Sequence, residues 1–241
     1  MQEQVYHSNF KQENEYFWFI ARNKIVLDVF EKVCTLEKGS NVIDIGCGTG
    51  GFASKLLDKG YAVTGTDTEP IALDYSRKRG LTDLHLGTLD NFQATKDYKA
   101  AFMLDVIEHI EDDRGVVKQV YDLLPSGAWF TTTVPAYQWM WSHHDEIHKH
   151  YRRYSMSGFR NLIEGAGFKT KYSSHFNTLL FPMALGKRLI DRIASSKENP
   201  HDEVPGFLNK AFTKIFSSES GILQKTSIPF GLSILVISQK P

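Results

Sequence analysis

Two acidic residues flank a glycine-rich turn near residue 46, and this arrangement points to a bound nucleotide or nucleoside. Apolar residues 42–45 lead into the glycine segment 46–51, and apolar side chains at helical spacing follow it. A buried strand, a tight turn and a helix form a nucleotide-binding βα unit, in which glycine lets a ligand approach the backbone. Asp67 ends the next apolar run, where an acid can bind both ribose hydroxyls. The turn residues expected to contact the ligand are Gly46, Cys47, Gly48 and Gly50.

The acid that precedes the turn distinguishes two ligand classes. The glycines also satisfy G-x-G-x-x-G, the pattern of a dinucleotide site, which places a pyrophosphate on the helix N-terminus. Asp44 lies just before Gly46, where its charge would repel a pyrophosphate. A carboxylate there suits a cationic ligand, such as the amino-acid end and the sulfonium of S-adenosylmethionine. Asp67 fits adenosine in either class, so the choice rests on Asp44.

A second concentration of chemistry lies between Trp139 and Tyr154, which hold four of the nine histidines. Histidine titrates near neutral pH, so an imidazole oriented by Asp145 can remove a proton from an acceptor. The candidates are His144 and His150, and we expect His150 to be the base. The alternative is a metal site, but no spacing here matches a zinc pattern, and we expect no metal. The side chains expected to hold the acceptor, through a phosphate or carboxylate, are Tyr151, Arg152 and Tyr154; the alternative is a rim that only orders the loop.

With these motifs, the chain resembles the class I S-adenosylmethionine-dependent methyltransferases. Residues 98–110 look like the fourth strand and following turn of the ubiquinone-O-methyltransferase-like branch, and residues 123–128 are similar to its next helix-ending turn. Residues 17–22 and 134–154 look like those of a bacterial group associated with surface polysaccharide or lipid-linked glycan synthesis. The resemblance implies S-adenosylmethionine as the cofactor and S-adenosylhomocysteine as its product.

The resemblance also implies cofactor contacts outside the glycine turn. Some relatives aim an arginine of an N-terminal helix at the methionine carboxylate, and the residues after the third and fourth strands contact the cofactor. Carried over to this chain, these contacts are Arg22, Thr68, Thr88, Leu89, Leu104, Asp105 and His109. Glu108 and His109 have a second interpretation as acid–base groups, and a third as structural residues.

Strand patterns alternate with helical patterns along the chain, which predicts a doubly wound α/β sheet. The resemblance implies the Rossmann-like form with seven strands in the order 3-2-1-4-5-7-6, the last one antiparallel. We expect a single domain over residues 1–241, with an N-terminal helical lid (1–38), a cofactor-binding half (39–135) and a substrate-side half (136–241). Strands are expected at residues 42–45, 61–66, 84–86, within 98–110, and at 129–134, 171–176 and 234–237.

An insertion, residues 177–229, exceeds the minimal fold and includes an expected amphipathic helix over residues 179–193. Its apolar face, flanked by Lys187, Arg188 and Arg192, suits either a lid that touches lipid-linked substrate or membrane, or an ordinary core-packed helix. The 28 basic and 28 acidic residues balance, so no nucleic-acid partner is expected. No signal peptide or transmembrane stretch is apparent, and we expect a cytoplasmic protein of unknown oligomeric state with reduced cysteines.

These features together predict methyl transfer to a small-molecule or lipid- or nucleotide-linked glycan acceptor, at a hydroxyl oxygen. N-methyl transfer to an amino sugar or small amine is the enzymatic alternative. A catalytically silent module that binds S-adenosylmethionine is the alternative of a different class.

Overall fold

Seven strands form one sheet in the computed structural model, which describes residues 3–186 and 204–241. The strand order is β3-β2-β1-β4-β5-β7-β6, and only β7 runs antiparallel to its neighbours among the described strands, which confirms the expected Rossmann-like fold. The observed strands extend one or two residues beyond several predicted ends. They are β1 (Asn41–Ile45), β2 (Ala62–Asp67), β3 (Asp83–Leu86), β4 (Ala100–Leu104), β5 (Trp129–Pro135), β6 (Lys169–Phe176) and β7 (Ser233–Gln239).

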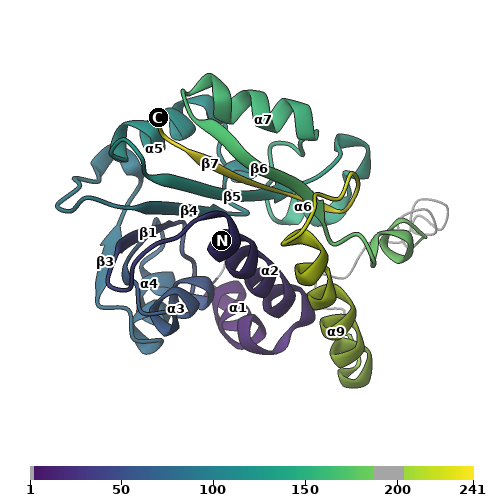
Figure 1. Ribbon diagram of the computed structural model, residues 1–241. Coiled ribbons are helices and arrows are strands. Elements are labelled where there is room, and N and C mark those ends of the chain that lie inside the picture. The colour runs from purple at the N-terminus through teal and green to yellow at the C-terminus, as the bar shows by residue number, and fades with distance from the viewer. Residues whose placement is uncertain (1–2, 187–203) are drawn as a thin grey trace.

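Helices cover both faces of the sheet. In Figure 1, α5 and α7 lie above the sheet, while α1 to α4 and α9 lie below it. The longer helices are α1 (Glu3–Glu15), α2 (Phe17–Val33), α3 (Gly51–Asp58), α4 (Pro70–Lys78), α5 (Asp113–Leu123), α7 (Met156–Gly165) and α9 (Gly206–Leu223). The short helices are η1 (Leu89–Asn91), η2 (Ile107–His109), η3 (Gln138–Met140) and α6 (His143–Ile147).

Two apolar clusters, one on each face, hold the sheet and its helices together. The first joins α2, α3 and α9 to the sheet through residues such as Phe30 and Phe102. The second joins α5 and α7 to the opposite face through residues such as Phe130 and Phe159. Burial of these large side chains supplies the main driving force for the fold, at roughly 1.5–3 kcal/mol each. This frame fixes the carboxyl ends of β1, β4 and β5, where open α/β folds bind ligands.

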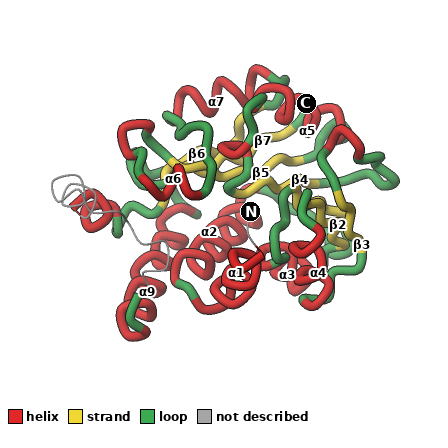
Figure 2. Tube along the Cα trace, turned by 180° about the vertical axis from the view of Figure 1, so that it is seen from behind, coloured by secondary structure: helices red, strands yellow, loops and turns green. Residues whose placement is uncertain are grey.

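The N-terminal segment expected to form a lid consists of two helices with different surroundings. α2 is a core helix, because Ile25, Val26, Val29 and Phe30 are fully buried. α1 lies over the glycine turn and packs on the C-terminal half of α4 instead (Figure 2). The lid expected over residues 1–38 stays a prediction, and of its two helices only α1 lies over the glycine turn.

Helix α9, which belongs to the expected insertion, packs against the N-terminal helices, a contact that the sequence did not indicate. α9 packs along α2, and the Asn209 side chain accepts a hydrogen bond from the Phe17 amide and donates one to the Glu15 carbonyl. The junction of α1 and α2 is thus tied to α9. Of the amphipathic helix expected at 179–193, residues 181–186 are helical, and residues 187–193 lie outside the described part of the chain.

Candidate active site

The glycine turn between β1 and α3 has the backbone conformation that only glycine adopts readily. Gly46, Gly48 and Gly50 have φ angles of 72°, 55° and 81°. A Cβ at Gly46 would lie 2.7 Å from Val106, and one at Gly50 would lie 2.7 Å from the Ser76 hydroxyl. At Gly48 a Cβ would meet no atom within 4 Å, so this backbone faces open space, as a ligand-contacting turn requires.

Asp67, at the end of β2, is tied to the same turn. One carboxylate oxygen accepts the Gly48 amide at 2.9 Å, and the other accepts the Glu69 amide at 3.0 Å. Burial raises the pKa of Asp67, although these two amide hydrogen bonds oppose the shift. Each carboxylate oxygen has a second lone pair, so Asp67 keeps the capacity to accept two ribose hydroxyls.

A cavity of about 70 Å³ lies beside the turn and collects several of the predicted cofactor residues. Its walls are Glu13, Phe19, Arg22, Asn23, Asp44, Gly46, Cys47, Gly48, Phe52 and Leu104. Small-molecule pockets usually measure about 300–1,000 Å³, so a nucleoside-sized ligand needs more room than this. α1 and α2 both supply part of the wall, and α2 is anchored in the core. We therefore expect α1 to be the element that moves when a ligand binds.

Asp44 and Arg22 both line this cavity, so its wall contains one acidic and one basic side chain. Asp44 is 3% exposed, and burial raises its pKa to about 7, against the opposing effect of Arg22. The guanidinium of Arg22 lies over the Trp18 ring, and its Nε is 3.4 Å from a carboxylate oxygen of Asp105. Neither that Nε nor that oxygen has a hydrogen-bond partner among the described residues. The site therefore holds charged groups that a zwitterionic ligand can satisfy.

Glu13, on α1, occupies the place where a dinucleotide site would bind phosphate. Its carboxylate accepts the Thr49 hydroxyl at 2.5 Å and a hydrogen bond from Arg79 at 3.0 Å, at the start of α3. A Cβ on Gly51 would lie 2.4 Å from the same carboxylate oxygen. A helix N-terminus attracts anions, and here the chain supplies the anion itself. This geometry disfavours a pyrophosphate ligand, in line with the argument from Asp44.

Seven predicted cofactor residues are not among those that line the cavity: Gly50, Asp67, Thr68, Thr88, Leu89, Asp105 and His109. Thr68 is exposed, and Thr88 is exposed with its hydroxyl bonded to Asp90. Leu89 packs against the second apolar cluster. The expected adenine contacts of Thr88 and Leu89 stay predictions, because the cavity that the structure holds ends before it reaches them.

The histidine-rich segment is organised around Asp145, which is fully buried. Arg153 donates two hydrogen bonds to its carboxylate, at 2.7 and 3.0 Å, and the Ser142 amide donates a third at 2.9 Å. The ring Nδ1 of His150 lies 2.8 Å from the carboxylate. Burial alone would raise the pKa of Asp145, but the hydrogen bonds from His150 and Arg153 outweigh it and hold the pKa below its usual range.

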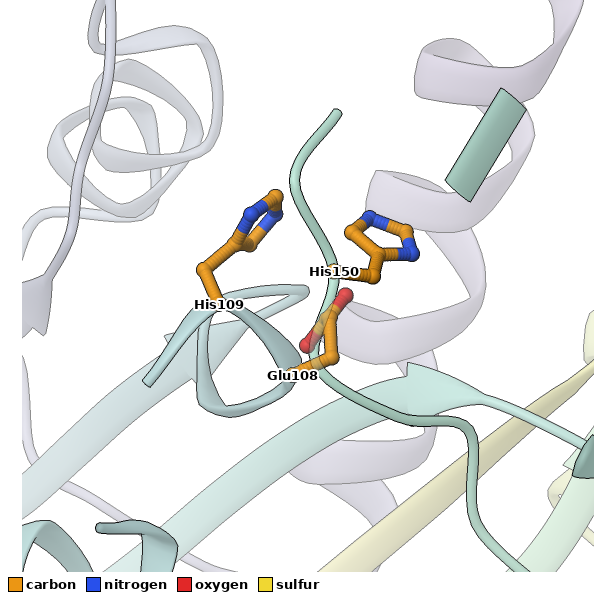
Figure 3. A group of neighbouring side chains, drawn as sticks. All are labelled: Glu108, His109 and His150. Atoms are coloured by element: carbon orange, nitrogen blue, oxygen red, sulfur yellow. The ribbon is translucent and has the colours of Figure 1, made fainter. Parts of the chain in front are cut away.

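Asp145 fixes the tautomer of His150. A carboxylate only accepts hydrogen bonds, so Nδ1 carries the proton and Nε2 is the free nitrogen of the neutral ring. His109, on η2, meets His150 edge to face at 4.6 Å between ring centroids. Figure 3 shows the Glu108 carboxylate pointing from η2 towards His150, with His109 beside it. The structure therefore places His109 with the predicted acceptor residues, not in the cofactor cavity.

His144, the other candidate base, lies in a less suitable environment. Its ring packs against His148 with the centroids 4.2 Å apart. Burial and the neighbouring His148 lower the pKa of His144 to about 3. Burial and His150 likewise lower the pKa of His109 to about 4. Both rings are neutral at physiological pH and poor proton acceptors, which argues against His144 as the base. The choice of His150 stays a prediction.

The residues predicted to hold an acceptor phosphate or carboxylate are largely engaged within the protein. Arg152 forms an ion pair with Asp113 at 2.8 Å and donates to the Glu111 carbonyl. The Tyr154 hydroxyl donates to Asp113 at 2.9 Å, and its ring lies in the second apolar cluster. Tyr151 is exposed. This arrangement shows Arg152 and Tyr154 ordering the loop, and their contact with an acceptor stays a prediction.

Three residues at these sites were not predicted in the roles that the structure shows. Glu13 lies on a strongly polar helix, and the one signal was its helical spacing with Tyr6 and Phe10 on one face. Arg153 stands next to the predicted acceptor ligand Arg152, yet its guanidinium bonds to the Asp145 carboxylate inside the protein. Glu108 looked polar and ambiguous, yet it is 1% exposed and borders His150.

The chain matches the model of a known protein family. Residues 12–172 match the model of a family described as a methyltransferase domain. The chain belongs to this methyltransferase family. The match spans β1 to β6 and therefore includes the glycine turn, Asp67 and the segment around Asp145.

Two curated relatives are bacterial ubiquinone biosynthesis O-methyltransferases. The protein of Xylella fastidiosa strain M23 is 29% identical over 122 residues, covering 47% of this chain and 49% of the relative. That of Actinobacillus pleuropneumoniae serotype 7 is 31% identical over 124 residues, covering 46% and 53%. The chain thus aligns with about half the length of these methyltransferases.

Solved structures support the fold. A Haemonchus contortus phosphoethanolamine N-methyltransferase 2, in complex with S-adenosylmethionine, has a TM-score of 0.60 at 16% identity, covering 90% of this chain and 52% of that one. A Thermotoga maritima methyltransferase, described as a possible histamine N-methyltransferase, has a TM-score of 0.58 at 17% identity over the full length of both chains. In the part of this methyltransferase that the structure describes, no helix is long and apolar enough to cross a membrane.

Proposed function

We propose that the chain transfers the methyl group of S-adenosylmethionine to a hydroxyl oxygen of a small-molecule or lipid- or nucleotide-linked glycan acceptor. The proposal rests on one observation: the glycine turn and the His150 loop lie at the same edge of the sheet. The glycine turn with Asp44 lies at the end of β1, and His150, held by Asp145, lies between the ends of β4 and β5. Asp105, which Arg22 contacts from the cofactor side, lies within electrostatic range of His150, so a methyl donor and a proton acceptor bound at this edge can face one another.

The charged residues beside the glycine turn complement the charges of S-adenosylmethionine. Asp44 and Asp105 supply carboxylates for the amino group and the sulfonium, and Arg22 supplies a guanidinium for the methionine carboxylate. Asp67 supplies the acceptor for the ribose hydroxyls. S-adenosylhomocysteine, the product, lacks the sulfonium charge and binds through the remaining contacts.

The acceptor side fits a hydroxyl that must lose a proton. The methyl group on sulfonium is already activated, so the protein aligns the hydroxyl and removes its proton. The free Nε2 of His150 takes the proton while Asp145 stabilises the resulting imidazolium. The Tyr151 amide donates to the Glu108 carbonyl at 2.7 Å, which joins the His150 loop to η2.

An aromatic group at the same edge supports an acceptor that carries a ring. Tyr137 stacks on His175 and on Trp139, and it holds a strained φ of 63°. Trp139 is 53% exposed, and Phe181 meets it edge to face. Sugar or aromatic rings pack on such surfaces, and this surface adjoins the end of β5.

The alternative of N-methyl transfer has one specific observation in its favour. Asp105 and Glu108 each bury a carboxylate oxygen without a hydrogen-bond partner among the described residues. A protonated amine would satisfy both. Matched acceptors that differ only in a hydroxyl or an amine at one position separate the two reactions.

The test uses labelled S-adenosylmethionine with a panel of glycosides, polyprenyl-linked glycans and their amino analogues. We expect His150→Gln to reduce turnover by about 10²–10⁴-fold, the usual contribution of a positioned base, with cofactor affinity unchanged. The matched control is His143→Gln, because His143 is an exposed histidine of the same segment that bonds Glu146. Equal turnover in both variants contradicts the role of His150. Cofactor binding without acceptor-dependent product release identifies a silent binding module.

A further inference from the structure

The geometry points to a divalent metal site formed by Glu108, His109 and His150. Each residue offers one ligand atom, and the three atoms lie within 4.8 Å of one another. Across the described residues, no other group of three histidine, cysteine or acidic side chains comes as close together. This spacing lets a single cation contact all three after small side-chain rotations (Figure 3).

The state of Glu108 supplies the second observation. Its side chain is buried, and Oε2 has no hydrogen-bond partner in the described part of the chain. A buried carboxylate oxygen without a partner is costly, and such atoms call for an explanation. One carboxylate oxygen of Glu108 lies within 4.8 Å of a ring nitrogen of His109 and of one of His150, and a cation between these groups provides a partner for the buried carboxylate.

The surroundings of His150 match those of a metal-binding histidine. Such a histidine commonly donates its second ring N–H to a carboxylate, which fixes the ring and the tautomer. Here Nδ1 is bound to Asp145, which Arg153 holds with two hydrogen bonds, and Nε2 is left as the ligand atom. The ring is also held in place by burial, because its side chain is 9% exposed.

The donor set indicates the class of metal. Two imidazole nitrogens and one carboxylate suit Mn²⁺, Fe²⁺, Co²⁺, Ni²⁺ or Zn²⁺, whereas Mg²⁺ and Ca²⁺ prefer sites made entirely of oxygen. Three protein ligands leave coordination positions open, as catalytic sites require. Short loops after β4 and β5 provide the ligands, and the Tyr151 amide joins the loops by its bond to the Glu108 carbonyl.

This inference rests on the proposed methyl transfer and replaces one step of it, because His150 becomes a metal ligand in place of the proton acceptor. A cation here would bind the acceptor hydroxyl and lower its pKa, so the hydroxyl proton leaves to water while the cation holds the oxygen. The O–CH₃ bond then forms as the S–CH₃ bond breaks, and the electron pair of that bond stays on sulfur. His150 would hold the cation and would no longer need to take the proton itself.

The test titrates the full chain, freed of metal by dialysis against a chelator, with Co²⁺ and follows the visible absorption of the bound ion. We expect one Co²⁺ per chain, and affinity at least about tenfold weaker in Glu108→Gln, His109→Gln and His150→Gln, since the loss of even an outer partner costs that much. His143→Gln, the exposed control, should bind as the native chain does. Absence of Co²⁺ absorption in the native chain, or unchanged affinity in His109→Gln, overturns the site.

Turnover separates this inference from the function beneath it. Metal-free protein should bind S-adenosylhomocysteine normally but release little product with an acceptor, and added Co²⁺ or Zn²⁺ should restore release. Full turnover without metal overturns the catalytic role of the cation and leaves the methyltransferase proposal intact. If Co²⁺ binds as expected but no acceptor supports product release, the metal site stands and the proposed function falls.

Discussion

The cofactor and acceptor sides of the sheet edge are held in place by different kinds of bond. The glycine turn is held by its backbone: its glycines have left-handed φ angles, and its Gly48 amide donates a hydrogen bond to Asp67. Around His150, side-chain charges do it: Arg153 and Asp145 form a buried ion pair that orients the ring. We therefore expect the glycine turn to keep its conformation when a neighbouring side chain is changed. The His150 loop should lose its conformation when either member of the ion pair is removed.

The largest effect should follow from breaking the ion pair. Asp145→Ala leaves Arg153 buried without a partner, and the loss of one member of a buried pair typically costs about 3–5 kcal/mol. We expect the free energy of unfolding to fall by about that amount. Glu146→Ala, at an exposed neighbouring position, should change it little. Urea denaturation measures both, and an equal, small loss would show that the loop does not depend on the pair.

The next largest effect concerns Asp44 and pH. Because burial raises its pKa from 3.8 to about 7, the folded chain binds more protons than the unfolded chain between these values. Stability of the unliganded protein should therefore fall as pH rises through this window, by up to about 4 kcal/mol at 1.4 kcal/mol per pKa unit. Asp44→Asn should flatten this dependence and stabilise the protein above pH 7 while weakening S-adenosylmethionine binding. Thermal unfolding at several pH values measures it; equal pH profiles would contradict the assignment.

A smaller loss is expected at the other acid of the cofactor side. Asp67→Ala removes the proposed ribose contacts, each of which is a hydrogen bond to a charged group. Affinity for S-adenosylhomocysteine should fall by about 1–3 kcal/mol. The exposed Asp74→Ala on α4, paired only with Arg77, is the control. If calorimetry gives the same affinity for both variants, Asp67 does not contact the cofactor.

The smallest effect should come from removing α1. Deletion of residues 1–15 spares the core helix α2, whereas a longer deletion to residue 22 would remove buried residues of α2. Without Glu13 to close over the turn, S-adenosylmethionine should enter faster and leave faster still, with a net affinity loss of about tenfold, or 1.4 kcal/mol. Stopped-flow fluorescence measures both rates. An unchanged dissociation rate would mean that α1 is not a lid.

The difference between the two sides also explains what the sequence could predict. The strand order, the glycine turn and the clustering of Asp44 with Gly46 and Gly48 followed from local patterns and the family resemblance. The partners of Asp145 did not, because Arg153 can pair with substrate or with a neighbouring carboxylate, and only tertiary packing decides. Glu13 was missed for the same reason, since nothing local shows that a polar helix folds back on the start of α3.

Calorimetric titration of the native chain with S-adenosylmethionine and, separately, with NADH tests the central claim most directly. Asp44 and the Glu13 carboxylate at the start of α3 should admit the sulfonium ligand and exclude the pyrophosphate. The account predicts binding of one S-adenosylmethionine per chain and no detectable binding of NADH. Saturable NADH binding, with none for S-adenosylmethionine, would contradict it.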